Sequence, residues 1–169
     1  KAVSNILPQY TIINPSIHKI KHLPNKIRTN KVVLYYGKVR SNLNYKGLNK
    51  LLDNFDEIEI FTRSYPSTKE EMYRILSESR LLISLDSLSS LCHESTILGT
   101  PVYIYDNVFK NQYKNFNFKL HGFYYDVTSD DLVNIYEDSK DLSTKALMEL
   151  QNHVLNQSSK TNELIHNVE

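Results

Sequence analysis

The sequence predicts an α/β fold: a doubly wound parallel sheet of about six strands with helices on both faces. Short apolar runs alternate along the chain with stretches whose apolar residues recur at helical spacing. The connections between them are short, as expected for crossover units that join parallel strands. The 169 residues include only four glycines and five prolines and show no internal repeat, which argues against solenoids and low-complexity linkers.

The first half of the predicted sheet has two different strand patterns. Residues 31–36 form a β-branched and aromatic run that ends at Gly37, which is typical of a buried strand followed by a loop. Residues 57–61 alternate polar and apolar side chains, and this predicts a half-exposed strand near an edge. Between them, residues 45–55 carry one apolar stripe and are expected to form an amphipathic helix.

The second half contains the most apolar strand. Residues 81–85 are almost continuously apolar, so we expect this strand at the centre of the sheet, buried on both faces. A helix capped by Ser67 or Thr68 is predicted before it, and a helix over residues 88–98 that ends at Gly99 is predicted after it. The remaining expected elements are strands over 102–105 and 122–125 and helices over 130–136 and 143–155.

The pattern predicts one Rossmann-like domain with short flanking segments. Residues 1–30 are interpreted as an interdomain connector, residues 31–157 as the domain, and residues 158–169 as a weakly ordered tail. An apolar content of 40% supports one substantial core in a chain of this length. Because the chain begins with Lys1, we expect it to be part of a longer protein.

Composition excludes several classes of function. Twenty basic and nineteen acidic residues leave a net charge of +1, so no sequence-wide field recruits nucleic acid or an anionic membrane. The single cysteine, Cys92, cannot form an intramolecular disulfide, which favours a reducing, cytoplasmic compartment. No apolar run approaches the roughly 20 residues of a membrane span. The sequence has no Asp-x-Asp, no His-Glu-x-x-His and no paired cysteines, so we expect no metal site and no cofactor.

The segment from residue 84 to residue 102 is the richest in chemistry. It reads in order as a strand, a hydroxyl-rich turn, a helix, Gly-Thr-Pro and a strand. Free backbone N–H groups at the helix start, together with the hydroxyls of Ser87, Ser89 and Ser90, would bind a phosphate with help from the helix dipole. The same serines are also explained as an ordinary N-cap.

Glu94 lies in the same predicted helix, about a turn and a half after its start. A carboxylate in this position can accept hydrogen bonds from both hydroxyls of a ribose. The alternative is a carboxylate on a solvated helix face. Both interpretations stay open at this point.

This segment resembles the donor-site signature of GT-B glycosyltransferases, which are built from two Rossmann-like domains. In that family the helix start binds the pyrophosphate of a nucleotide sugar and the Glu binds its ribose, so the resemblance assigns these roles to Ser89, Ser90 and Glu94. Many members also carry a second Glu shortly upstream with glycines between. Here Asp86 and Ser87 stand in that region, and the sugar-recognition role is left unassigned.

Basic residues after the first strand extend the resemblance. The loop Gly37-Lys38-Val39-Arg40 and the later Lys46-Gly47 are similar to the family's glycine-plus-basic loop and downstream Lys-Gly. There, basic side chains neutralise the diphosphate leaving group, whose negative charge grows in the transition state. We expect Lys38 or Arg40 to have this catalytic role, with Lys46 as a third candidate. The alternative is a solvated basic loop.

Two further segments match less specifically. Residues 11–17 are similar to the peptide that enters the C-terminal domain in this family. Thr62, Arg63 and Tyr65 follow the second predicted strand, where family members enclose the nucleotide base, and Arg63 or Tyr65 is expected to stack on it. The resemblance covers about residues 11–125 in order.

The resemblance implies a metal-independent bacterial glycosyltransferase that transfers a sugar from a nucleotide-sugar donor to a glycan acceptor in surface polysaccharide biosynthesis. This chain would be the C-terminal, donor-binding domain. The acceptor site would lie on a missing N-terminal domain, so we expect no turnover by the fragment alone, and any inner-membrane association would come from that domain. Two alternatives stay open: half of a nucleotide-sugar epimerase with the same fold, and a non-catalytic α/β binding module in which Ser89, Ser90 and Glu94 are only cap and surface.

Overall fold

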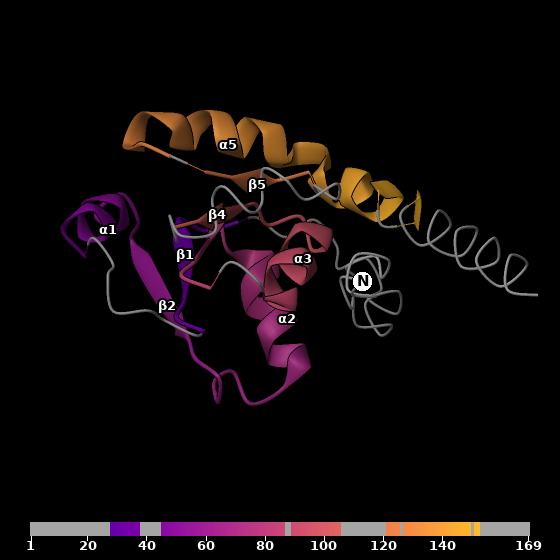
Figure 1. Ribbon diagram of the computed structural model, residues 1–169, viewed down its shortest axis with the longest axis horizontal. Coiled ribbons are helices and arrows are strands. Elements are labelled where there is room, and N and C mark those ends of the chain that lie inside the picture. The colour runs from indigo at the N-terminus through magenta and orange to yellow at the C-terminus, as the bar shows by residue number, and fades with distance from the viewer. Residues whose placement is uncertain are drawn as a thin grey trace, which may run out of the picture.

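The core of the protein is a parallel sheet of five strands in the order β2-β1-β3-β4-β5 (Figure 1). The computed structural model describes residues 28–37, 45–86, 89–105, 121–125, 127–149 and 151–152. The strands are β1 (Lys31–Tyr35), β2 (Glu57–Phe61), β3 (Leu81–Ser84), β4 (Val102–Ile104) and β5 (Phe123–Tyr124). The predicted α/β class and parallel sheet are confirmed, and the described residues contribute five strands where about six were expected.

Helices connect the strands as crossover units require. The helices between successive strands are α1 (Tyr45–Leu52), α2 (Lys69–Glu78) and α3 (Ser90–Ile97). After β5 come the short 3-10 helix η3 (Ser129–Asp131), α5 (Leu132–Asp138), the 3-10 helix η4 (Ser139–Asp141) and a helical stretch at 142–149. Thr68 is the N-cap of α2, because its side chain accepts a hydrogen bond from the backbone N–H of Glu71. Of the two predicted caps, Thr68 is therefore the one used.

The positions of β3 and β2 agree with their sequence patterns. β3 is central and all of its residues are buried. β2 is at the edge of the sheet, and Ile58 and Ile60 on it are exposed. A strand that is apolar throughout has to be covered on both sides. For β2 the predicted edge position is confirmed, but its exposed face carries the two isoleucines, whereas alternation normally turns the apolar side chains inward.

Alternate side chains of β1 belong to two separate hydrophobic clusters. Val32 and Leu34 pack in a cluster with residues of α1 and α5. Val33, between them, packs in a cluster with residues of α2 and α3. Because successive strand side chains point to opposite faces, the sheet separates these two clusters.

The last residues of the expected connector contact the folded domain. The backbone N–H of Thr29 donates to the carbonyl of Glu78, at the end of α2. The side chain of Arg28 donates to the carbonyl of Leu98, which ends α3, and burial lowers the pKa of this guanidinium. A cation at this end of a helix is favoured by the helix dipole. Residues 1–27, 106–120 and 153–169 lie outside the described part of the chain, so the expected entry peptide at 11–17 and the expected tail at 158–169 are not described.

Candidate functional site

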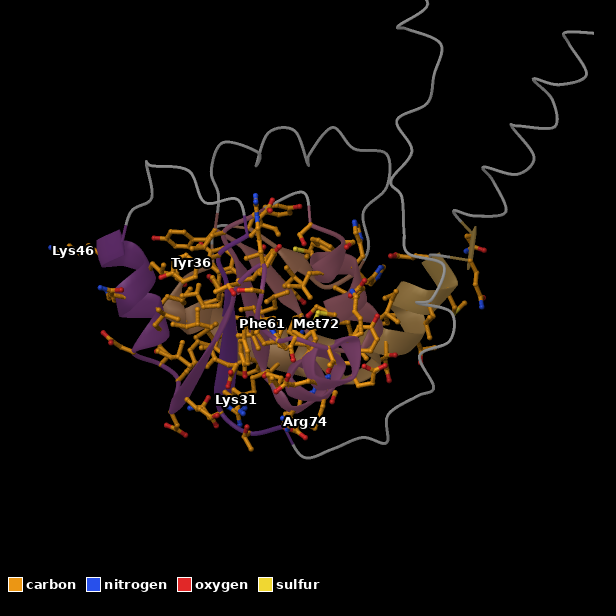
Figure 2. All side chains as sticks on the ribbon, turned by 90° about the horizontal axis from the view of Figure 1, so that it is seen from below. Lys31, Tyr36, Lys46, Phe61, Met72 and Arg74 are labelled. Atoms are coloured by element: carbon orange, nitrogen blue, oxygen red, sulfur yellow. The ribbon has the colours of Figure 1, made fainter. Side chains whose placement is uncertain are left out.

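The strand order places a topological switch between β1 and β3. The chain leaves β1 toward β2 on one side, whereas β3 is followed by β4 and β5 on the other side. In open parallel sheets, ligands bind outside the carboxyl ends of the strands at such a point, where the following loops diverge. Figure 2 shows Lys31 and Tyr36 at the two opposite edges of the sheet, and Tyr36 marks the carboxyl edge.

Four residues at this edge define what we call the switch-point site: Gly37, Asp86, Ser89 and Ser90. Gly37 has a φ of +46°, which favours glycine, and a Cβ built on it would lie 2.4 Å from the Asp86 Cβ and 2.6 Å from its Oδ2. The loops after β1 and β3 are thus packed so closely that a side chain at position 37 would displace Asp86. The structure places Gly37 and Asp86, which are far apart in the sequence, in contact.

The loop after β3 is held by hydrogen bonds to its own strand and to β1. The Ser84 hydroxyl donates to the Asp86 carbonyl at 2.7 Å. The Leu85 N–H donates to the Tyr35 carbonyl at 2.9 Å. These bonds hold the backbone of Asp86 at the carboxyl edge of the sheet, between β1 and β3, and its side chain is half-buried there.

The start of α3 carries the two predicted phosphate-binding serines. Ser89 is the N-cap, and its hydroxyl accepts a hydrogen bond from the Leu91 N–H at 3.2 Å. This is the ordinary capping interaction that the sequence also allowed. Ser90 is exposed at the first position of the helix. Ser87 lies outside the described residues.

Glu94 is fully buried, so a solvated helix face is the wrong description of its position. Both of its carboxylate oxygens accept hydrogen bonds from the Lys69 Nζ, at 2.9 and 2.7 Å. A ribose would reach this carboxylate only after Lys69 had moved away. Its predicted role as a ribose ligand stays a prediction.

Lys69 is the polar residue that sequence reasoning missed. It is the first residue of α2, and about half of its side chain is exposed while its ammonium group contacts the buried carboxylate. The Nζ also lies 5.6 Å from the centre of the Tyr73 ring. Burial, followed by the charge of Glu94, raises the pKa of Tyr73 to about 12. One signal was present in the sequence. A lysine directly after the N-cap is unfavourable because its charge opposes the helix dipole, and this indicates a compensating interaction elsewhere in the fold.

The predicted basic residues are only partly described. Lys38 and Arg40, the expected leaving-group residues, lie outside the described residues. Lys46 is exposed on α1, and Figure 2 shows its side chain pointing away from the sheet. It lines an open depression together with Gly47, Asn49, Lys50 and Asp53, and this lining includes no member of the switch-point site.

The turn after β2 contains the residues expected at the nucleotide base. The Thr62 side-chain oxygen accepts from the Tyr65 N–H at 3.1 Å, and the Thr62 N–H donates to the Tyr65 carbonyl at 2.8 Å. The Tyr65 hydroxyl donates to Glu59 at 2.7 Å, which raises the pKa of Tyr65, and its ring packs edge-on against Phe61. Arg63 is exposed in the same turn. Because β2 lies one strand away from the switch, the stacking role of Arg63 or Tyr65 stays a prediction.

Two further titratable residues of α3, Cys92 and His93, are buried. Burial raises the pKa of the Cys92 thiol to about 12, so it is a thiol rather than a nucleophilic thiolate at neutral pH. His93 packs against the ring of Phe123 at 5.2 Å between ring centres. Within the described ranges, no group of three or more His, Cys, Asp or Glu side chains is arranged to hold a metal ion.

Comparisons with known proteins leave the fold and the site geometry as the basis for functional inference. No protein-family model matches the chain, and no curated protein matches it. None of the helices in the described part of the chain is long and apolar enough to cross a membrane.

Proposed function

We propose that this chain is the donor-binding domain of a glycosyltransferase that transfers a sugar from a nucleotide sugar to a glycan acceptor in surface polysaccharide biosynthesis. The observation that carries the proposal is the contact between Gly37 and Asp86 at the switch between β1 and β3, beside the start of α3. This is the position in open parallel sheets where nucleotides are bound. The serine, Glu and Gly-x-Pro order of the adjacent segment gives the chemical class.

In this proposal the donor lies with its diphosphate at the switch-point site. The exposed Ser90 and the first N–H groups of α3 contact the phosphates, because a helix start favours negative charge. Lys38 or Arg40 stabilises the departing nucleoside diphosphate as the bond to the sugar breaks. The turn at Thr62 and Tyr65 encloses the base. No metal ion is required in this scheme.

The acceptor and the groups that activate it belong to a second domain in this proposal. The isolated chain therefore binds nucleotide without transferring a sugar. In the full domain the sheet has a sixth strand and helices cover both faces, and the enzyme works in the cytoplasm, with any inner-membrane contact made by the second domain.

Isothermal titration of the chain with UDP, GDP, CDP and CMP at millimolar concentration tests the proposal. We expect a heat of binding with one of these nucleotides and a weaker or absent heat with the others, because the base is recognised. No heat with any of them would contradict the proposal.

A second candidate is a non-catalytic α/β binding module. It is favoured by the fact that the Ser89 hydroxyl and the Glu94 carboxylate already have protein partners, as cap and ion-pair residues would. The nucleotide titration distinguishes the two candidates, since a module without a donor site gives no heat of binding with any nucleotide.

A further inference from the structure

The ion pair between Lys69 and Glu94 is asymmetric in its exposure. The Glu94 side chain has no exposed surface, whereas the Lys69 side chain is 49% exposed. An ionised carboxylate inside a protein has to be paired and hydrogen-bonded, because its desolvation is costly. Glu94 meets this requirement through both oxygens, and it thereby holds a flexible lysine in one position.

The ammonium group of Lys69 has a hydrogen-bonding capacity that Glu94 does not exhaust. An ammonium group has three N–H donors and no acceptor. Two contacts go to the Glu94 oxygens, and the Tyr73 ring lies beside the group. The third donor has no acceptor among the described residues, and the side chain is partly open to solvent. The result is a pre-oriented cation with a donor left for an anion.

The location of Lys69 suits an anion at the carboxyl edge of the sheet. α2 follows β2 and α3 follows β3, so both helices begin at this edge, and Figure 1 shows them next to each other. Lys69 is the first residue of α2, and Ser90 is the first residue of α3. The ammonium group of Lys69 lies at Glu94, about one helical turn after the exposed Ser90.

We propose that Lys69, positioned by the buried carboxylate of Glu94, is an anion-binding residue that contacts a phosphate group of the nucleotide donor. The identity of the anion rests on the proposed function. Glu94 is then a positioning residue that acts through Lys69, rather than the group that accepts the ribose hydroxyls.

Titration of the chain with inorganic pyrophosphate tests Lys69 without any nucleoside. We expect Lys69→Met to weaken pyrophosphate binding about tenfold, the usual effect of losing one charge-assisted hydrogen bond. Lys69→Arg should keep most of the affinity. The matched control is Arg74→Met, which removes one positive charge from an exposed position on the same helix and should leave the affinity unchanged.

A second variant removes the risk that Lys69→Met fails to fold with an unpaired buried carboxylate. The double variant Lys69→Met/Glu94→Met removes both charges, and such replacements of buried ion pairs are often neutral for stability. Its thermal melting, followed by circular dichroism, reports whether it is folded. We expect the folded double variant to bind pyrophosphate as weakly as Lys69→Met. If it binds as tightly as the original chain, the proposal is overturned.

The same titrations separate this inference from the proposed function. If pyrophosphate binding depends on Lys69 but no nucleotide gives a heat of binding, the anion site stands and the nucleotide-donor proposal fails. If a nucleotide binds and the double variant binds it equally well, the donor proposal stands and the role of Lys69 is overturned. An original chain that binds neither pyrophosphate nor any nucleotide contradicts both.

Discussion

The fully buried carboxylate of Glu94 accepts hydrogen bonds through both oxygens from Lys69, a residue 25 positions earlier in the chain. This pair links the start of α2 to the middle of α3. The pair affects the stability of the fold separately from anion binding. Lys69 compensates the buried carboxylate of Glu94 whether or not a ligand is bound.

Lys69→Met should lower the free energy of unfolding by about 3 kcal/mol. This is near the lower end of the losses that follow removal of one partner of a buried ion pair, because half of the lysine side chain is exposed. The reason is the buried, unpaired carboxylate that remains. Urea denaturation followed by circular dichroism measures the change. Lys69→Met/Glu94→Met should recover most of the loss, and a double variant as unstable as the single one would show that the pair is not the cause.

Gly37→Ala should weaken nucleotide binding at the switch-point site, because its Cβ would displace the side chain of Asp86. The matched control is Gly122→Ala, which also has a positive φ and meets Leu142 instead, away from the switch. Both variants should lose about 1–2 kcal/mol of stability from the left-handed backbone. Isothermal titration should show weaker binding for Gly37→Ala alone, and equal affinities for the two variants would argue against the site.

Thr68→Ala should lower the free energy of unfolding by about 1 kcal/mol, because Thr68 caps α2. Ser67, its exposed neighbour, provides the control, and Ser67→Ala should be close to neutral. Urea denaturation compares the two variants. A larger loss for Ser67→Ala would mean that the helix begins elsewhere.

Stability should fall as the pH rises from about 9 to about 12, because burial raises the pKa of the Cys92 thiol from 9.0 to about 12. The folded chain keeps the thiol proton over this range while the unfolded chain loses it, so unfolding becomes more favourable with each unit of pH. Tyr73, with a pKa raised to about 12, acts in the same direction. Urea denaturation at several pH values should show that the free energy of unfolding falls less steeply with pH for Cys92→Ala than for the original chain. An equally steep fall in the variant would contradict the assignment to the thiol.

The fold was predictable where the sequence pattern is set by burial alone. The continuous apolar run at 81–85 predicted the central strand, since both of its faces are covered, and the alternating run at 57–61 predicted the edge strand. The pattern did not predict that Ile58 and Ile60 would be exposed. The start of α2 and the turn at Gly99 were also predictable, because caps and positive φ depend on local residues.

The candidate site was only partly predictable, because its main contacts join residues far apart in the chain. Local patterns marked Gly37 and Asp86 without revealing that one is packed against the other. Glu94 was interpreted as a ribose ligand or a solvated carboxylate, and neither interpretation predicted its burial against Lys69 of another helix. A contact between side chains of two different helices leaves no periodic pattern in a single sequence.

Backbone amide chemical shifts provide the most direct test that the switch between β1 and β3 is a nucleotide site. The chain, labelled with nitrogen-15, is titrated with the nucleotide that gives the largest heat of binding. We predict the largest shifts at Gly37, Asp86 and Ser90, with smaller shifts at the turn after β2. Shifts confined to other parts of the chain, such as α5 or the depression on α1, would contradict the account.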